Sequence, residues 1–246
     1  MTFIWEKLGK IIQPKPERSW MRTWTGASFA RQISNSPLFE IFITGSADKN
    51  RSQVGKIIID INKPNEIKEI VELPVISFGN LGAFDENGVS YPWLFEWNNT
   101  NYMLYVGWMP TVLTPFMNGL GLAVENRNGC FDRYSRAPIL PRNNDDYLSI
   151  GSSSVFVEEN KIRLYYTSFL KWGSKPDEHK HYYVIKYAES IDGINWIRNN
   201  HVCIDILYDW EYSICRPSVI KIGDTYHMWF SYRGEGYLLG YAYSVD

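Results

Sequence analysis

Apolar and aromatic residues recur along this chain in short runs separated by polar turns, the pattern of β-strands joined into hairpins. The fullest example lies between residues 79 and 108. A Gly-rich loop carrying Asp85 and Glu86 precedes an apolar run at 89–95, and after an Asn-rich turn an aromatic run returns at 102–107. The pattern predicts a hairpin whose flanking residues lie together at one end of a sheet.

The hairpin recurs along the chain. Segment 89–107 is matched by 153–168 and by 217–232, with 61 positions from Pro92 to Ser153 and 64 from Ser153 to Pro217. Moving 64 positions back from Pro92 reaches Ser28, and an aromatic run follows at 39–45. We therefore expect four repeats of one structural unit.

Each repeat continues beyond its hairpin. A third strand is predicted at 54–61, 120–124, 183–190 and 238–244, and an outer strand at 70–76, 136–140 and 202–206. Repeats of this length with four strands are typical of β-propeller blades. We expect one all-β domain over residues 1–246, a β-propeller whose blades are four-stranded antiparallel sheets.

The last repeat ends at Asp246 without an outer strand, whereas residues 4–12 can be aligned with 195–203 around the outer strand of the third repeat. The alignment predicts that the N-terminal strand closes the last blade by pairing with 238–244, or with the equivalent strand of a neighbouring chain. Such pairing would protect an exposed sheet edge.

The composition supports a large hydrophobic core. The chain has 246 residues, of which 45% are hydrophobic, and its 25 basic and 27 acidic residues give no expectation of nucleic-acid binding. The 10 Trp, 17 Tyr and 12 Phe suit strands and also the stacking of sugars. Three cysteines without metal-type spacing and no apolar leader at 1–10 predict a cytoplasmic protein. The uncharged run at 102–124 is broken by Pro and Gly, so no membrane span is expected.

Four segments, at 82–89, 187–190, 215–219 and 228–234, resemble the superfamily of arabinanase, levansucrase and invertase glycosidases, which includes bacterial proteins like glycoside hydrolase families 43 and 32. The resemblance implies a five-bladed propeller that acts on carbohydrates, one blade more than the repeats seen here. It also implies acids at the starts of several inner strands, where this chain has Tyr91, Ser152 and Arg216.

Acids stand instead in the loops just before three inner strands. Glu86, Asp146 and Glu211 precede Pro92, Ser153 and Pro217 by six, seven and six residues, and Asp85 lies beside Glu86. A ring would gather these loops at the funnel mouth, and two carboxyls about 5 to 10 Å apart suit glycosidic chemistry. The alternative is that these acids cap turns or are solvated.

Candidate binding residues share that face. Arg216 stands just before Pro217 and can clamp a carboxylate or phosphate, with Arg51 and Arg233 at the ends of second strands, or these arginines form salt bridges between blades. Tyr91, Trp108 and Trp172 are candidate sugar contacts, and rim packing is the alternative for the two tryptophans. His179 and His181 form an isolated HxH pair, so we expect no metal, and no cofactor motif is present.

Two classes of function follow. The first is a glycosidase-like enzyme acting on a glycan or activated sugar, with Glu86 and Glu211 as the acid/base pair and Asp146 as alternate partner; glycosyl transfer or phosphorolysis is the variant favoured by the arginines. The second is a non-catalytic carbohydrate-binding or assembly propeller. The expected ligand is a carbohydrate, sugar phosphate or nucleotide sugar, and a homo-oligomer or partner chain completing the ring is an open alternative.

Overall fold

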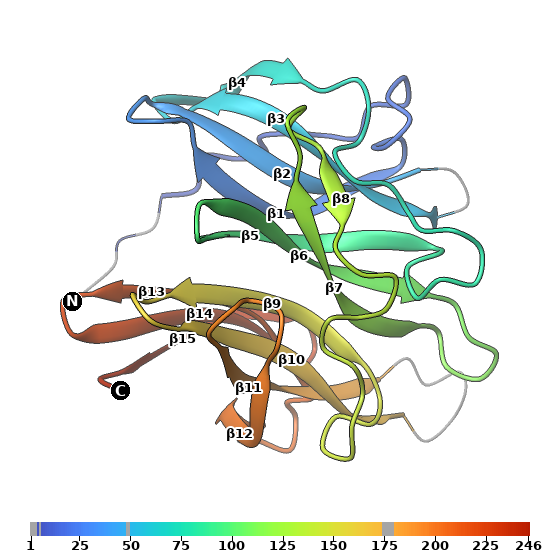
Figure 1. The fold of residues 1–246 in the computed structure, drawn as a ribbon, viewed down its shortest axis with the longest axis vertical. Helices are drawn as coiled ribbons and strands as arrows, with labels where there is room; N and C mark the ends of the chain where they lie inside the picture. Colours follow the sequence, from blue (N-terminus) through green and yellow to red (C-terminus); the bar gives the residue numbers. More distant parts are fainter. Residues whose placement is uncertain (1–3, 5, 48–49, 174–179) are drawn as a thin grey trace.

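Groups of antiparallel strands follow one another along the chain as propeller blades. The computed structural model describes residues 4, 6–47, 50–173 and 180–246. In Figure 1 the blades run from β1–β4 at the top to β9–β15 at the bottom. Blade I contains β1 (Trp24–Gln32), β2 (Leu38–Ser46), β3 (Ser52–Asp60) and β4 (Lys63–Ile70). Blade II contains β5 (Gly88–Trp97), β6 (Thr100–Met109), β7 (Met117–Glu125) and β8 (Phe131–Arg133). Blade III contains β9 (Ile150–Val157), β10 (Ile162–Trp172), β11 (His181–Ser190) and β12 (Ile197–Ile204), and blade IV contains β13 (Ser213–Ile222), β14 (Thr225–Arg233) and β15 (Tyr237–Ser244).

The strands of each blade pair in chain order, each antiparallel to the next. The first strands lie innermost, because β1 contacts β5, β5 contacts β9, and β9 contacts β13. Single parallel bridges, Ser52 with Gly88 and Tyr183 with Ser213, join blade I to blade II and blade III to blade IV. The predicted all-β propeller, its hairpins and its third strands are confirmed. The fifth blade implied by the resemblance stays a prediction.

The hairpin of blade II follows from its turn. Asn98 and Asn99 both have left-handed φ, 49° and 59°, and Trp97 pairs with Thr100 across them. Asn tolerates this conformation better than most residues, and two positive φ values give the turn whose twist matches that of the flanking strands. The local sequence therefore sets the register of β5 on β6.

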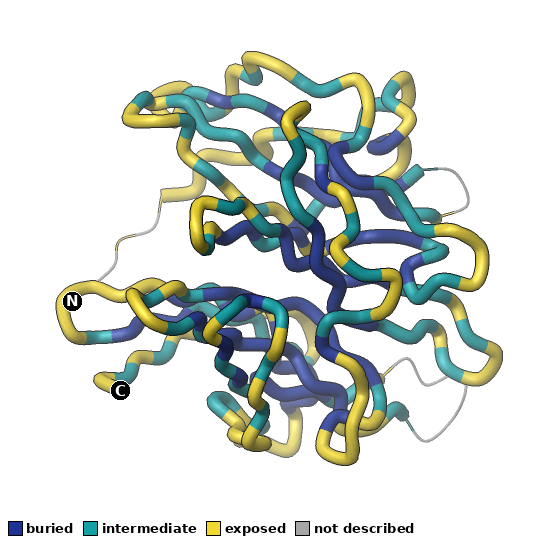
Figure 2. Tube along the Cα trace, in the orientation of Figure 1, coloured by how far each residue is buried: buried dark blue, intermediate teal, exposed yellow. Residues whose placement is uncertain are grey.

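The core lies between blades. One buried cluster joins blades II and III, with Leu104 and Leu122 on one side and Leu164 on the other. Similar clusters lie between blades I and II around Phe42 and Met103, and between blades III and IV. In Figure 2 the buried residues follow the inner parts of the sheets, while the connecting turns are exposed. The hydrophobic stabilisation is thus spread over successive blade interfaces.

The uncharged run at residues 102–124 is part of the sheet. It covers most of β6, the connection to β7 and most of β7 itself. In the described part of the chain no helix is long and apolar enough to cross a membrane.

The outer strands lie earlier than predicted. The predicted segment at 70–76 touches β4 only at Ile70, the segment at 136–140 follows β8, and the one at 202–206 shares only its first three residues with β12. The reason is exposure: β4 is Lys63–Ile70, whose polar run carries little apolar signal. The apolar residues Ile76 and Leu140 that suggested strands make isolated bridges to Val54 and Leu120.

The N-terminal segment does not extend blade IV. Residues 4 and 6–12 form no strand, and among described residues β15 pairs with β14 alone. Asn65 donates a hydrogen bond to the Leu8 carbonyl (3.4 Å), and Ile12 packs on the cluster around Trp20. Gly9 has a φ of 85°, which interrupts an extended run. The predicted pairing with 238–244 within the chain is wrong, because this segment lies against blade I; pairing with a neighbouring chain stays a prediction.

Candidate functional site in the propeller funnel

Irregularities recur at one place in the inner strands. Ala27, Tyr91 and Arg216 occupy equivalent positions of β1, β5 and β13, and all have left-handed φ, of 44°, 52° and 53°. Strand register shifts between Ser90 and Trp93 and between Cys215 and Ser218, as it does on either side of Ala27. Such bulges redirect side chains and are common beside active sites.

Hydroxyl groups of neighbouring blades support the bulged backbone. The Tyr91 N–H donates to Thr44 Oγ1 (3.0 Å), and the Arg216 N–H donates to Ser152 Oγ (3.1 Å). Ser152 also lies 3.2 Å from the Thr167 hydroxyl. A left-handed residue other than Gly costs about 1–3 kcal/mol and persists only where its surroundings hold it. The backbones of Tyr91 and Arg216 are therefore each held in place by a hydroxyl group of the preceding blade.

A pocket of about 480 Å³ opens at these bulges. It is bounded by inner strands β5, β9 and β13 and by aromatic residues of blades II, III and IV. The lining comprises Tyr91, Val106, Phe116, Asn118, Gly151, Ser152, Thr167, Phe169, His181, Tyr183, Cys215, Arg216, Ser231 and Tyr237. We refer to it as the funnel pocket. It brings together the three residues that replace the acids expected from the resemblance.

Among the described lining residues, Arg216 supplies the charge of this pocket. The Arg216 guanidinium lies 5.4 Å from the centre of the Tyr91 ring, within the range of a cation–π contact. Desolvation raises the pKa of Tyr91, against the opposing effect of Arg216, and burial raises the pKa of Cys215 to about 11. Burial also raises the pKa of Tyr183. These three groups are therefore uncharged near neutral pH.

An aromatic cluster forms one wall. His181 stacks on Phe169 and Tyr183, with ring centres 5.8 and 5.2 Å apart, and Phe116 meets Phe169 edge-on. Trp172 packs behind Phe116 at 5.1 Å and is absent from the lining.

The other predicted tryptophan contact lies elsewhere. Trp108 donates from Nε1 to Ser52 Oγ (2.7 Å) and so joins blade II to blade I. Both tryptophans contact neighbouring residues of the protein, and their roles as sugar contacts stay predictions.

Asp146 is buried in an ion-pair network between strands of blade III. Its carboxylate, 1% exposed, accepts hydrogen bonds from Ser168 (2.6 Å), Tyr166 (2.9 Å), Lys186 (3.0 Å) and Arg198 (3.0 Å). Burial opposes ionisation, but the hydrogen bonds from Ser168 and Lys186 outweigh it and hold the pKa of Asp146 below its ordinary value. A carboxylate so engaged is poorly suited to proton transfer.

Asp85 has the corresponding place before blade II. It is also 1% exposed, and it accepts hydrogen bonds from Arg133 Nε (2.7 Å) and the Tyr105 hydroxyl (3.2 Å). A side chain at Gly79 would meet the Asp85 carboxylate, which explains the glycine in this loop. We refer to Asp85 and Asp146 as the blade anchors.

The two glutamates remain near the loops where sequence analysis located them. Glu86 is half-buried and accepts a hydrogen bond from the Gly82 N–H (2.6 Å). Glu211 is 8% exposed and accepts from the N–H groups of Leu207 (2.9 Å) and Tyr208 (3.4 Å). Neither lines the funnel pocket. All three bonds are of the turn-capping kind, and the catalytic roles of the four acids stay predictions.

The remaining arginines flank the pocket's surroundings. Arg51 donates to the Glu86 carbonyl (2.7 Å) and stacks on Phe78, 3.3 Å from its ring centre. The Arg233 guanidinium lies 5.0 Å from the centre of the ring of Tyr237, which lines the funnel pocket. Only Arg216 of the three lines the pocket itself.

Metal-binding groups do not gather among the described residues: no three His, Cys, Asp or Glu side chains there could share an ion. His179 of the HxH pair lies outside the described residues, and His181 belongs to the aromatic wall.

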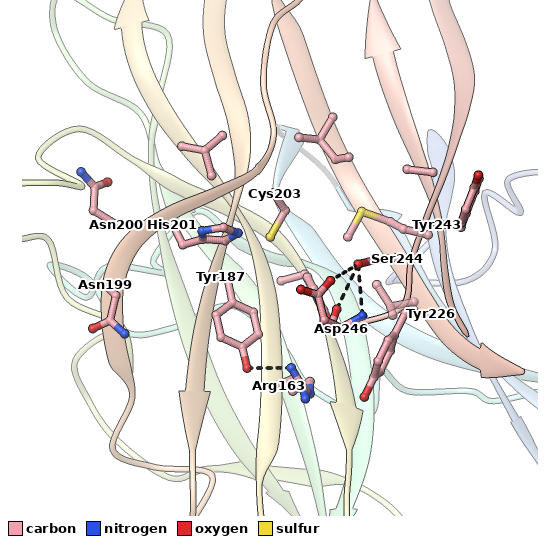
Figure 3. Close-up of a pocket in the computed structure, with 16 residues that line it drawn as sticks. Arg163, Tyr187, Asn199, Asn200, His201, Cys203, Tyr226, Tyr243, Ser244 and Asp246 are labelled. Atoms are coloured by element: carbon pink, nitrogen blue, oxygen red, sulfur yellow. Dashed lines mark hydrogen bonds between the residues drawn. The ribbon is translucent and has the colours of Figure 1, made fainter. Parts of the chain in front are cut away.

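A second cavity, of about 730 Å³, lies between blades III and IV (Figure 3). Arg163, Tyr187 and His201 line its blade III side, and Tyr226 and Ser244 its blade IV side. The Arg163 guanidinium donates to the Tyr187 hydroxyl at 3.4 Å. This second cavity lies beside β15, whose outer edge has no partner among described residues.

Several pocket residues were not found from the sequence. Phe116, Asn118, Tyr183, Ser231 and Tyr237 are ordinary residues of strands or their ends, and no local motif distinguishes them. The repeat alignment was the one usable signal, because it marked the equivalent positions Tyr91, Ser152 and Arg216.

A comparison with protein-family models finds no match. Two Mycobacterium tuberculosis proteins, MT1551 of strain CDC 1551 / Oshkosh and Rv1502 of strain ATCC 25618 / H37Rv, are each 33% identical over 242 residues, 98% of this chain and 80% of theirs. Among solved structures, a glycoside hydrolase has a TM-score of 0.77 at 15% identity, covering 98% of this chain and 74% of its own. The α-L-arabinanase of Cellvibrio cellulosa has a TM-score of 0.57 at 13% identity, covering 89% and 72%.

A further neighbour comes from the GH130 family of mannoside phosphorylases, which contains glycoside hydrolases that target β-1,2 mannosidic linkages in Candida mannan. It has a TM-score of 0.70 at 14% identity, covering 94% of this chain and 73% of its own. These likenesses show that the chain has the fold of β-propeller glycosidases.

Proposed function

This chain belongs to the family of the mycobacterial proteins MT1551 and Rv1502, and on that premise we propose that it is a glycosidase-like enzyme acting on a glycan or activated sugar held in the funnel pocket. The carrying observation is the convergence of Tyr91, Ser152 and Arg216 on one concave site of a fold shared with glycoside hydrolases. Concave pockets with aromatic walls and a few directed polar groups are the usual form of small-ligand sites.

The lining suits a sugar ring. Phe116 is half-buried and offers an apolar ring, and the half-buried Asn118 offers an amide group that can bind sugar hydroxyls. An aromatic face packs against the C–H side of a sugar while the polar groups select its hydroxyl pattern. The pocket's volume of about 480 Å³ is enough for a ligand of one or two rings.

Proton transfer is assigned to Glu86 and Glu211 in this proposal. Both stand in loops that lead into inner strands, β5 and β13, and neither is in an ion pair among described residues. Asp85 and Asp146 are less suitable, since each is held by a cation and a tyrosine hydroxyl. One carboxylic acid would protonate the leaving oxygen, and the other would activate water or attack the sugar carbon.

Phosphorolysis or glycosyl transfer is the second candidate, favoured by Arg216. Attack by phosphate would break the bond from the sugar carbon to the leaving oxygen and form a sugar phosphate, with one acid donating the proton. This needs a single carboxyl and a cation for the phosphate. A non-catalytic carbohydrate-binding propeller is the remaining alternative, favoured by the lining's lack of a carboxylate among described residues.

A panel of glycosides and nucleotide sugars, with and without inorganic phosphate, tests the proposal. Hydrolysis independent of phosphate is the expected result. Turnover only in the presence of phosphate would favour phosphorolysis. Binding without turnover of any compound would contradict the enzyme proposal and favour the binding protein.

Location and assembly are part of the proposal's setting. We propose a cytoplasmic, single-domain protein, based on the cysteine pattern and the continuous series of blades. A homo-oligomer, in which a second copy covers the β15 edge, is the alternative to a monomer.

A further inference from the structure

The funnel pocket carries an unmatched positive charge. Of its described lining residues, Arg216 is the only one with a side chain charged throughout the neutral range, and no carboxylate is among them. Several other arginines of the chain are in ion pairs: Arg31 pairs with Glu125, Arg133 with Asp85 and Arg163 with Glu158. The lining therefore has a cation and no anion to balance it.

The backbone of Arg216 is also held in a defined position. The Arg216 backbone has a left-handed φ of 53° and is followed by Pro217. The Arg216 N–H donates a hydrogen bond to Ser152 Oγ. Its guanidinium lies over Tyr91, which has the same unusual backbone conformation and is supported in the same way by Thr44. Two strained residues on separate blades thus present one cation to the pocket.

A second cation lies near. The Arg233 guanidinium faces the ring of Tyr237, a lining residue, and its Nε is buried with no hydrogen-bond partner in the structure. Tyr237 in turn lies 3.4 Å, oxygen to oxygen, from Tyr183. The blade IV side of the pocket is therefore electropositive, whereas the blade III wall of Phe169 and His181 is aromatic.

We propose that the sugar bound in the funnel pocket is anionic, and that Arg216, supported by Tyr91, binds its oxyanion. This rests on the proposed function and specifies its substrate class: a sugar ring bearing a carboxylate or a phosphate group. A guanidinium matches either group through two parallel hydrogen bonds, and the aromatic wall packs against the ring. Neutral sugars of the same configuration leave Arg216 without a partner and bind more weakly.

Calorimetric titration of matched ligands tests this. The panel pairs glucuronate, galacturonate and mannuronate with glucose, galactose and mannose, and adds the corresponding 1-phosphates and inorganic phosphate alone. We expect at least one uronate or sugar phosphate to bind about tenfold to a hundredfold more tightly than its neutral partner, the range for a hydrogen bond to a charged group. Preference for uronates identifies a carboxylate ligand, and preference for 1-phosphates a phosphate ligand.

Variants separate this from general charge effects. Arg216→Gln should abolish the preference and leave affinity for the neutral sugar within about threefold, whereas Arg127→Gln, at an exposed loop arginine, should leave the preference intact. If Gln disturbs folding, Arg216→Asn provides a second test, because Asn tolerates the left-handed backbone conformation. Thermal unfolding checks that each variant is folded.

The outcomes are distinct. Equal affinity for acidic and neutral sugars, or a preference that survives in both Arg216 variants, overturns the anionic-sugar assignment while the proposed function stands. Binding of inorganic phosphate with no sugar preference overturns it in favour of phosphate as co-substrate. No binding of any sugar overturns both this inference and the proposed function.

Discussion

The blade anchors and the funnel pocket differ in whether their charged side chains have partners of opposite charge. Asp146 is 1% exposed and lies among four donors, two of them the cations Lys186 and Arg198. Arg216 is exposed in the funnel, where the described lining offers it an aromatic ring and no carboxylate. The buried charge of Asp146 is matched by cations of its own blade, because an unpaired buried ion is very costly. A charge left unmatched at a concave surface is available to a ligand, and this difference distinguishes structural from binding residues here.

Removing the charge of a blade anchor should have the largest effect. Asp146→Asn leaves Lys186 and Arg198 without their carboxylate, and loss of one partner of a buried pair costs about 3–5 kcal/mol. We expect that decrease in the free energy of unfolding, measured with urea at pH 7. Asp145→Asn, at the exposed neighbour, is the matched control and should change stability by less than about 0.5 kcal/mol.

The same variant has a defined pH dependence. Because the pKa of Asp146 is lowered in the folded protein, its contribution is fully present above its unfolded value, about 3.9, and is lost as the pH falls through the lower folded value. The stability difference between wild type and Asp146→Asn should therefore shrink below about pH 4. A difference that grows on acidification would contradict the assigned ion pairs.

Substitution of Glu86 and Glu211, the acids proposed to transfer protons, tests the catalytic role of the loops around the funnel pocket. Glu86→Gln and Glu211→Gln should each lower the turnover rate by about 10² or more if the pair transfers protons. Gln retains a carbonyl oxygen that can accept the backbone hydrogen bonds made by both glutamates, so folding should be preserved. Glu96→Gln, at an exposed position of β5, is the control. Unchanged rates in both variants would remove these residues from the mechanism.

The smallest expected effect concerns the support of Arg216. Ser152→Ala removes the acceptor of the Arg216 N–H, and we expect a loss of about 1 kcal/mol in stability together with weaker binding of the ligand. Ser153→Ala is the matched control, because the Ser153 hydroxyl is buried without a hydrogen-bond partner in the structure. Its removal should be neutral or slightly stabilising. Equal effects of the two variants would argue against hydroxyl support of the bulge.

Strands were predicted best where local sequence and tertiary context agree. The inner strands contain short apolar and aromatic runs and end at turns such as Asn98–Asn99, so hairpins and third strands were located well. Outer strands were misplaced because β4 has a polar, exposed sequence, and its position depends on pairing with β3. The N-terminal prediction failed for a related reason: similarity to an outer strand does not decide which blade a segment lies against.

The sequence by itself determined the all-β class, the repeat of about 61 to 64 residues and the equivalence of Tyr91, Ser152 and Arg216, because these depend on periodicity and spacing. Tertiary structure alone decided which charges are matched. Asp146 and Lys186 are 40 residues apart and meet through strand pairing within blade III, whereas Arg216 and Tyr91 are 125 positions apart and meet only because blades II and IV both face the funnel pocket. As isolated positions in the sequence, buried structural charges such as Asp146 cannot be told from charges that face a ligand site, such as Arg216. Their burial and their partners in the structure distinguish the two.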